Sequence, residues 1–227
     1  MIDWHAHLLP EADHGSPSAE HSLSQLALLS ECGVSAAVAT PHFYPDRESA
    51  KQFLERREAS ADKLRTVLKQ THIPVYLGAE VQAVEGIDHI RELDALCIRG
   101  TNVLLLEMPF YKWSEALFET VGRLCRMPYR ILLAHVNRYP VKDVLRLLAV
   151  GARAQLNAEM LGRRFPAKKY LHMVQDGTAV ALGSDIHLVE DYNRNRLLRT
   201  ASRYGSEAFA PLRRASEMLL EGAVPLT

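Results

Sequence analysis

Cysteine is scarce in this chain of 227 residues, which contains only Cys32, Cys97 and Cys125. An odd number without a Cys-x-x-Cys spacing argues against a disulfide framework and a zinc knuckle. Long apolar runs are missing too, since none approaches the ~18 residues of a membrane span. The first residues include an aspartate and histidines, where a secretory signal needs a basic stretch and an apolar core. These absences predict a soluble, cytoplasmic protein without membrane insertion.

An excess of one charge sign is also absent, because Lys and Arg total 27 and Asp and Glu total 27. Tracking a nucleic acid requires a basic stripe that the sequence lacks, so we expect no nucleic-acid partner. With 48% hydrophobic residues, the chain is long enough for one substantial core and short for two. We therefore predict a single domain over residues 1–227. Nothing in the sequence indicates its oligomeric state.

Short apolar runs alternate with segments of helical spacing. The runs are apolar on both faces, as expected for strands of a parallel sheet covered by helices. The predicted strands are residues 1–8, 34–40, 73–79, 103–106, 130–134, 153–156 and 178–182. The predicted helices are residues 18–33, 48–70, 114–126, 141–150, 167–175 and 195–220, the last broken near Gly205. About seven such units predict an α/β fold, a distorted or incomplete TIM-like (β/α)7 barrel.

Side chains that commonly bind metals gather where these runs end. His5 and His7 alternate with Ala6 in the first run, so both imidazoles should project on one side of the strand. His14 lies in the loop after the first run. The other candidates lie at or near the ends of later runs: His42, Glu80, Glu107, His135, Asp185 and His187. Because the carboxyl ends of parallel strands meet at one mouth of a barrel, this pattern predicts a metal site there.

The chemistry of the candidates narrows the choice of ion. A lone histidine is more often a hydrogen-bonded core residue, and Glu80 or Glu107 alone could be a solvated carboxylate, but so many coincidences at strand ends favour a metal centre. Imidazoles and carboxylates without a thiolate favour Mn, Fe or Zn over Ca or Mg. Nine candidates exceed the needs of one ion. We expect two or three divalent ions, with a carboxylate such as Glu80 bridging a pair. Such a site activates a water and stabilises both the attacking and the leaving oxygen of an in-line displacement. This arrangement is typical of phosphoester hydrolysis.

Several short motifs follow one another in order along the chain. They are HAHLLP at 5–10, DHG at 13–15, ATPH at 39–42, GAE at 78–80, LEMP at 106–109, AHVNRY at 134–139, QLNA at 155–158 and GSDIH at 183–187. The series resembles the polymerase and histidinol phosphatase (PHP) superfamily. It is most similar to the branch of manganese-dependent bacterial protein-tyrosine phosphatases from capsule and exopolysaccharide loci. The resemblance extends from residue 1 to about residue 187.

This resemblance implies a PHP-type barrel with three ions, Mn by preference, at its C-terminal mouth. It would place His5, His7, Glu80 and Asp185 around one ion, Glu80, Glu107 and His135 around a second, and His14, His42 and His187 around a third. The resemblance also implies that Arg138 holds the phosphate, a role that suits a guanidinium fork facing two phosphoryl oxygens. The alternative is an ordinary surface arginine before Pro140.

The chain departs from the pattern of this branch at two places. The branch carries two successive aspartates where this chain has Asp13 and His14, so either residue could be the ligand. An arginine that the branch supplies after its last histidine is matched only by Arg194 or Arg196, at a longer spacing. Either could reach substrate, or both could lie on a solvated helix face.

The resemblance implies hydrolysis of phosphotyrosine in proteins, namely in the tail of a tyrosine kinase that regulates capsular or exopolysaccharide synthesis. One alternative is a PHP phosphoesterase of a small phosphorylated metabolite, such as histidinol phosphate, or of a nucleotide. Another is a non-catalytic metal-binding regulatory module. Aromatic side chains expected near the mouth could pack on a tyrosine ring or on one another: Trp4, Phe43, Tyr44, Phe110, Tyr111 and Trp113.

Overall fold

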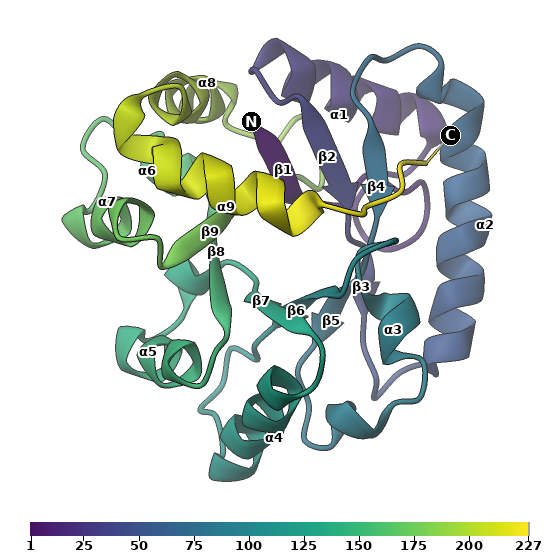
Figure 1. Ribbon diagram of the computed structural model, residues 1–227. Coiled ribbons are helices and arrows are strands. Elements are labelled where there is room, and N and C mark those ends of the chain that lie inside the picture. Colours follow the sequence, from purple (N-terminus) through teal and green to yellow (C-terminus); the bar gives the residue numbers. More distant parts are fainter. Residues whose placement is uncertain (227) are drawn as a thin grey trace.

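The computed structural model describes residues 1–226, and Thr227, the last residue of the predicted domain, lies outside the described residues. Strands form one curled sheet in the order β3-β5-β6-β7-β8-β9-β1-β2-β4, with all neighbours parallel (Figure 1). Their bounds are β1 (Ile2–Ala6), β2 (Ala36–Ala39), β3 (His42–Phe43), β4 (Val75–Leu77), β5 (Glu80–Gln82), β6 (Val103–Glu107), β7 (Arg130–Leu133), β8 (Arg153–Asn157) and β9 (Ala179–Gly183). Each predicted strand is therefore present.

Two of the predicted strands are continued by a short second segment. β3 follows β2 after Thr40 and Pro41, and β5 follows β4 after Gly78 and Ala79. β2 pairs with β4 and β3 with β5, and the amide of Glu80 donates to the carbonyl of Pro41 at 3.0 Å between these pairings. The two broken strands thus run side by side and bring the ends of the sheet together. This confirms a distorted, TIM-like α/β barrel with seven strand positions.

Helices cover the outside of the sheet. They are α1 (Ala19–Glu31), α2 (Ala50–Leu68), α3 (Leu93–Leu96), α4 (Glu115–Arg126), α5 (Val141–Ala149), α6 (Ala158–Leu161), α7 (Lys168–Gln175), α8 (Arg194–Tyr204) and α9 (Ala210–Leu220), with 3₁₀ turns η1 (Ile87–His89), η2 (Val136–Arg138) and η3 (Glu207–Phe209). Ser18, Ser49 and Ser114 cap α1, α2 and α4, each accepting from the backbone N–H three residues later. The six predicted helical segments are confirmed, whereas the one-turn helices α3 and α6 were not predicted.

α9 closes the N-terminal end of the barrel (Figure 1). Trp4 is fully buried there, and its indole Nε1 donates to Ser216 Oγ at 2.6 Å. Leu219 of α9 joins Trp4 in an apolar cluster with Val38, Leu105 and other strand residues. The expectation that Trp4 lies near the mouth is therefore wrong, because its ring is packed against the opposite closure.

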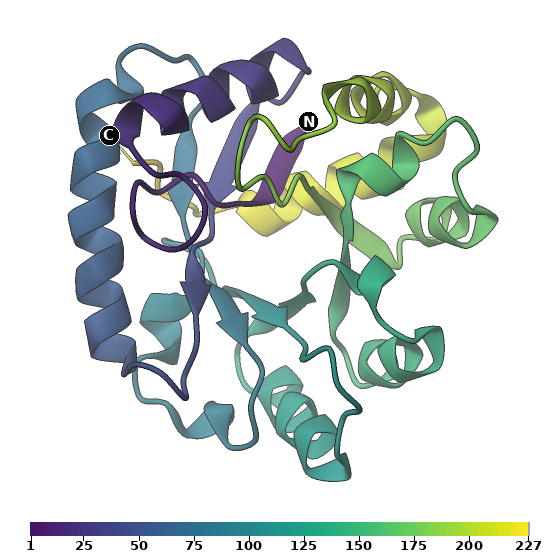
Figure 2. The same cartoon turned by 180° about the vertical axis from the view of Figure 1, so that it is seen from behind.

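Figure 2 shows the other face, where the loops that follow β1 (purple) and β9 (green) lie over the strand ends. Because every strand is parallel, this is the C-terminal mouth of the barrel. Cys32 and Cys97 are buried elsewhere as free thiols, and Cys125 is half-buried. Within residues 1–226, no helix has the length and apolar character needed to cross a membrane.

Candidate metal centre

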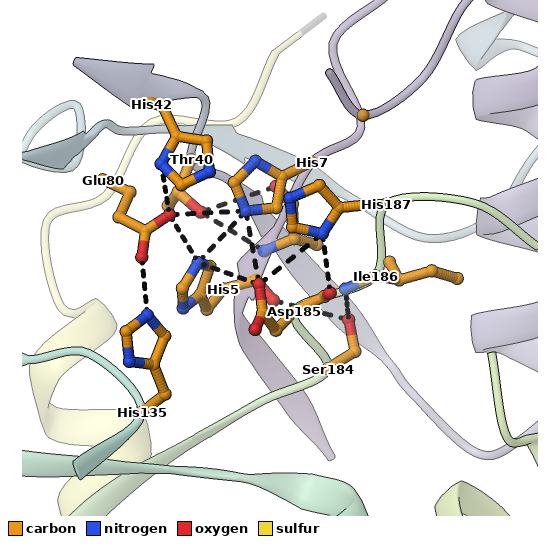
Figure 3. Close-up of polar contacts among 12 residues, drawn as sticks. His5, His7, Thr40, His42, Glu80, His135, Ser184, Asp185, Ile186 and His187 are labelled. Atoms are coloured by element: carbon orange, nitrogen blue, oxygen red, sulfur yellow. Dashed lines mark hydrogen bonds and ion pairs between the residues drawn. The ribbon is translucent and has the colours of Figure 1, made fainter. Parts of the chain in front are cut away.

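His5 in β1 and His7 just beyond it point into the mouth, with their Nε2 atoms 3.2 Å apart (Figure 3). Both side chains are fully buried. His7 Nδ1 lies 2.7 Å from Asp13 Oδ2, and His5 Nδ1 lies 3.4 Å from Gln155 Oε1. In the neutral form of each ring, an oxygen acceptor at Nδ1 fixes the tautomer and leaves the lone pair of Nε2 free for a metal. The pair can therefore offer two imidazole nitrogens to one cation.

Glu80, the first residue of β5, lies at the centre of the cluster. Its Oε2 is 3.0 Å from His5 Nε2, 3.4 Å from His7 Nε2 and 2.9 Å from His42 Nδ1. Its Oε1 is 3.0 Å from His135 Nε2. Burial opposes ionisation, but the charge of His5 and the hydrogen bond from His135 outweigh it and hold the pKa of Glu80 well below its ordinary value. This carboxylate is thus an anion that can bridge two cations.

Glu107 and His135 extend the cluster along the neighbouring strands. Glu107 ends β6 and His135 follows β7, and His135 Nε2 lies 3.4 Å from Glu107 Oε1. Burial lowers the pKa of His135, but hydrogen bonds to Glu107 and Glu80 outweigh burial and raise it to about 9. His42 Nδ1 lies 3.8 Å from Glu107 Oε2. The carboxylates of Glu80 and Glu107 therefore face the same two imidazoles.

Asp185 and His187 follow β9 on the other side of the mouth. Asp185 Oδ1 lies 3.6 Å from His5 Nε2 and 3.4 Å from His7 Nε2. Burial opposes ionisation of Asp185, but the charge of His5 and a hydrogen bond from His7 keep its pKa well below the ordinary value. His187 stacks on His7 with ring centroids 3.8 Å apart, and burial lowers its pKa to about 4. An anion and a neutral imidazole thus complete this side.

Two residues of the cluster have left-handed backbone conformations that favour glycine. His135 has φ 30° and Asp185 has φ 56°. The amide of His135 donates to Gln155 Oε1 at 2.6 Å, and the amide of Asp185 donates to the carbonyl of His5 at 2.7 Å. Such conformations cost roughly 1–3 kcal/mol each and persist where the surroundings enforce them. These hydrogen bonds hold both side chains toward the mouth.

The donor set fits divalent cations. Three groups of side chains each bring their ligand atoms within 4.8 Å of one another: His5, His7 and Glu80; His42, Glu80 and Glu107; and His7, His42 and His187. Two buried nitrogen atoms of the cluster, His135 Nδ1 and His187 Nε2, have no hydrogen-bond partner among residues 1–226. His42 Nδ1 and Glu80 Oε2 lie 2.9 Å apart, but neither makes a hydrogen bond of regular geometry within these residues. Buried polar atoms are normally paired, so this concentration of unpaired donors and acceptors fits a site built for ions.

A family model, capsular polysaccharide synthesis CpsB/CapC, matches residues 1–213. The chain belongs to this family. It is 20% identical over 230 residues to the tyrosine-protein phosphatase CpsB of Streptococcus pneumoniae, covering 91% of this chain and 92% of that protein. It is 27% identical over 203 residues to CapC of Staphylococcus aureus, covering 83% and 78%.

The CpsB/CapC fold is shared as well. A crystal structure from work on YwqE of Bacillus subtilis and CpsB of Streptococcus pneumoniae, described as metal-dependent tyrosine phosphatases, superimposes with a TM-score of 0.79. The alignment covers 99% of this chain and 96% of the other at 22% identity. The predicted family and the predicted fold class are both confirmed.

Eight of the nine predicted ligands come together in this CpsB/CapC-type mouth, and His14 lies at its edge. The His14 side chain is exposed, and its ring stacks on His42 and His187 with centroids 4.9 Å and 4.5 Å away. Asp13 lies deeper, where Oδ2 also accepts from the amide of His42 at 3.0 Å. Asp13 thus holds two neighbouring residues in place, while His14 faces the opening.

The arginines differ in their placement. Arg138 lies in η2 at the mouth, 42% of its side chain is exposed, and its guanidinium forms an ion pair with Asp185. Arg194 pairs with Glu31 at 2.8 Å, and Arg196 pairs with Glu159 at 3.0 Å. Of the three, Arg138 is the one in contact with the cluster.

Two polar residues of β8 support the site without having been predicted to do so. Gln155 is fully buried and contacts both His5 and His135, and Asn157 Nδ2 donates to Asp185 Oδ2 at 3.2 Å. The available signal was their alternation with apolar residues in an otherwise buried strand. Their partners could not be read from the sequence, because these depend on the register between strands.

The remaining aromatic side chains separate into core and rim. Phe43 and Trp113 are buried, so they pack within the protein. Tyr44 stacks on His42 at 5.1 Å between centroids. Phe110 and Tyr111 are 68% and 70% exposed beside the mouth, where Phe110 stacks on His135. Phe110, Tyr111 and the half-buried Tyr44 are therefore the rings of this set most open to a substrate.

Proposed function

We propose that this protein is a metal-dependent protein-tyrosine phosphatase that acts in capsular or exopolysaccharide synthesis. The observation that carries the proposal is Glu80, which is buried and ionised within 3.4 Å of four imidazole rings in a member of the CpsB/CapC family. The relatives named tyrosine-protein phosphatases support the substrate class.

The proposed ligands are the ones that the resemblance to the PHP superfamily implies. His5, His7, Glu80 and Asp185 would hold one ion, Glu80, Glu107 and His135 a second, and His42 and His187 with His14 a third. Distances of 3.0–3.6 Å between oxygens of Glu80, Glu107 or Asp185 and the imidazoles of His5, His7 and His135 support the first two sets. Mn is the ion we propose, with Fe and Zn as alternatives of the same borderline character.

Bound ions would provide a nucleophile at neutral pH and polarise the phosphoryl oxygens. The protein's own part is to bind and orient the phosphate. Arg138 lies at the mouth with its guanidinium beside Asp185. From there the guanidinium can donate two parallel hydrogen bonds to two phosphoryl oxygens. A tyrosine phenolate, with a pKa of about 10, leaves readily, so the reaction requires no strong general acid.

The proposed substrate is the phosphorylated tail of a bacterial tyrosine kinase of polysaccharide assembly. A flexible segment can approach the mouth from outside, where the exposed side chains of His14 and Arg138 lie at its edge. The exposed rings of Phe110 and Tyr111 at the rim are consistent with an extended substrate.

The test is hydrolysis by chelator-treated protein to which Mn, or in separate samples Fe or Zn, is returned. The substrates are a phosphotyrosine peptide, a phosphoserine peptide and histidinol phosphate, and the variants are His42→Ala, Arg138→Ala and, as the matched arginine control, Arg194→Ala. We expect activity on phosphotyrosine alone, lost in the first two variants and kept in the third. Turnover of only histidinol phosphate would assign the metabolite function, and no turnover with Mn, Fe or Zn would indicate a regulatory metal site.

A further inference from the structure

A groove adjoins the metal cluster on the side of Arg138. It has a volume of about 570 Å³ and lies between the segment after β6 and the start of α5. Arg138 lines it at one end, and Phe110, which also lines it, stacks on His135 with ring centroids 6.1 Å apart. The groove therefore begins where the metal ligands end, and its volume falls within the range of about 300–1,000 Å³ usual for ligand sites.

The floor of the groove is fixed in place. Trp113 and Tyr139 meet edge to face with centroids 5.4 Å apart, and both are buried. Trp113 Nε1 donates to the carbonyl of Pro109 at 2.8 Å, and the hydroxyl of Tyr139 accepts from the amide of Met108 at 3.1 Å. Phe110 and Tyr111 stand exposed above this floor. A ligand would thus meet a preformed aromatic surface, which lowers the entropic cost of binding.

The charges along the groove are unbalanced. Arg146 forms a two-pronged ion pair with Glu115, at 2.7 Å and 3.0 Å, which neutralises that carboxylate. Lys112 and Lys142 are exposed and have no ion-pair partner within 4.0 Å in the described part of the chain. Asp143 is the one other carboxylate in the lining. In a chain with equal numbers of acidic and basic residues, this is a local excess of positive charge.

We propose that this groove binds the segment of a phosphoprotein that adjoins the phosphotyrosine, and that Lys112 and Lys142 select acidic side chains in it. The proposal rests on the proposed function. With the phosphate at Arg138, the next residues of an extended chain, at about 3.3 Å per residue, would lie along Phe110 and Tyr111. Opposite charges across such an interface favour encounter and register.

The test compares two phosphotyrosine peptides that differ only in their flanking residues, glutamate in one and lysine in the other. The ratio of their kcat/KM values is measured at low salt for the wild type, for Lys112→Glu/Lys142→Glu and for Lys51→Glu/Lys69→Glu, a control with the same change of net charge on and just after α2. We expect the wild type and the control to prefer the acidic peptide by about tenfold, and the groove variant to lose or invert that preference.

Hydrolysis of p-nitrophenyl phosphate by the Mn-loaded wild type reports on the phosphatase reaction itself, because this substrate has no flanking segment. Activity on it with equal kcat/KM for the two peptides would overturn the groove proposal and leave the proposed function standing. A preference that persists unchanged in the groove variant would also overturn it. Failure to hydrolyse any aryl phosphate would overturn both.

Discussion

Nδ1 of His7 donates to Oδ2 of Asp13 across 2.7 Å, and this pair links the first loop to the metal cluster. Burial opposes ionisation of Asp13, but the hydrogen bond from His7, the charge of His7 and the hydrogen bonds from the amides of His42 and Gly15 together lower the pKa of Asp13, so the acceptor is a carboxylate. The same oxygen accepts from the amide of His42. Asp13 thus orients one ligand candidate and anchors the strand that carries another.

Replacing Asp13 by asparagine should weaken Mn binding about 10–100-fold, because the partner that orients His7 would lose its charge. The measurement is the Mn concentration that restores half of the phosphotyrosine hydrolysis in chelator-treated protein. Asp62→Asn, an exposed aspartate of α2, is the matched control and should leave this concentration unchanged. An Asp13→Asn variant with wild-type Mn dependence would show that His7 needs no such support.

Gly183→Ala should displace side chains that form and position the metal cluster. A Cβ at Gly183 would lie 2.5 Å from the Cβ of His5 and 2.6 Å from Nε2 of Gln155, so these two side chains would have to move. We expect lower metal content and a loss of stability of about 1–3 kcal/mol, in the range of an overpacked core. Gly122→Ala in α4 is the control, since its Cβ would meet only Arg126 at 3.6 Å. Equal stability and metal content in the two variants, measured by urea unfolding and metal analysis, would contradict this.

The stability of the metal-free protein should fall as the pH rises from about 6.5 to beyond 9. The pKa of His135 is raised to about 9 in the folded protein, against about 6.5 when unfolded. A raised folded pKa gives stability that is fully present below the unfolded value and is lost as the pH passes the folded one. His7, whose pKa is also raised, acts with the same sign.

Urea unfolding of chelator-treated protein at pH 6.5, 8 and 9.5 measures this dependence. His135→Gln removes one of the two titrating groups, so its stability should fall less steeply over that range. A metal-free wild type that becomes more stable toward pH 9.5 would mean that His135 is neutral in the folded protein.

Strand positions could be predicted because most runs are apolar on both faces, and β6 and β9 show this clearly. β3 and β5 were missed since each has two or three residues and follows a break, at Pro41 or at Gly78. The continuity of their pairing depends on backbone bonds between strands distant in sequence. The local hydrophobic pattern therefore predicted where the strands lie. It did not predict the breaks after β2 and β4 that direct the side chains of His42 and Glu80 toward the mouth.

The ligand candidates could be predicted because strand ends of a parallel sheet converge. Trp4 was wrongly predicted to lie near the mouth, because β1 runs within a few residues from the closed end near α9 to the mouth. The register between β1 and β2 shifts on this passage, between Asp3 and Ala6. The role of Gln155 depends on the register of β8 between β7 and β9, which brings its side chain to His5 and to the amide of His135. Sequence alone does not specify that register.

The central claim, that a multinuclear metal centre performs the hydrolysis, is tested most directly by counting ions and turnover together. Mn is titrated into chelator-treated wild type and Glu80→Gln, bound ions are counted by mass spectrometry, and phosphotyrosine hydrolysis is measured on the same samples. The account predicts two or three ions per wild-type chain, activity that rises with occupancy, and fewer ions with no activity in the variant. Full hydrolysis without bound metal, or full occupancy without hydrolysis, would contradict it.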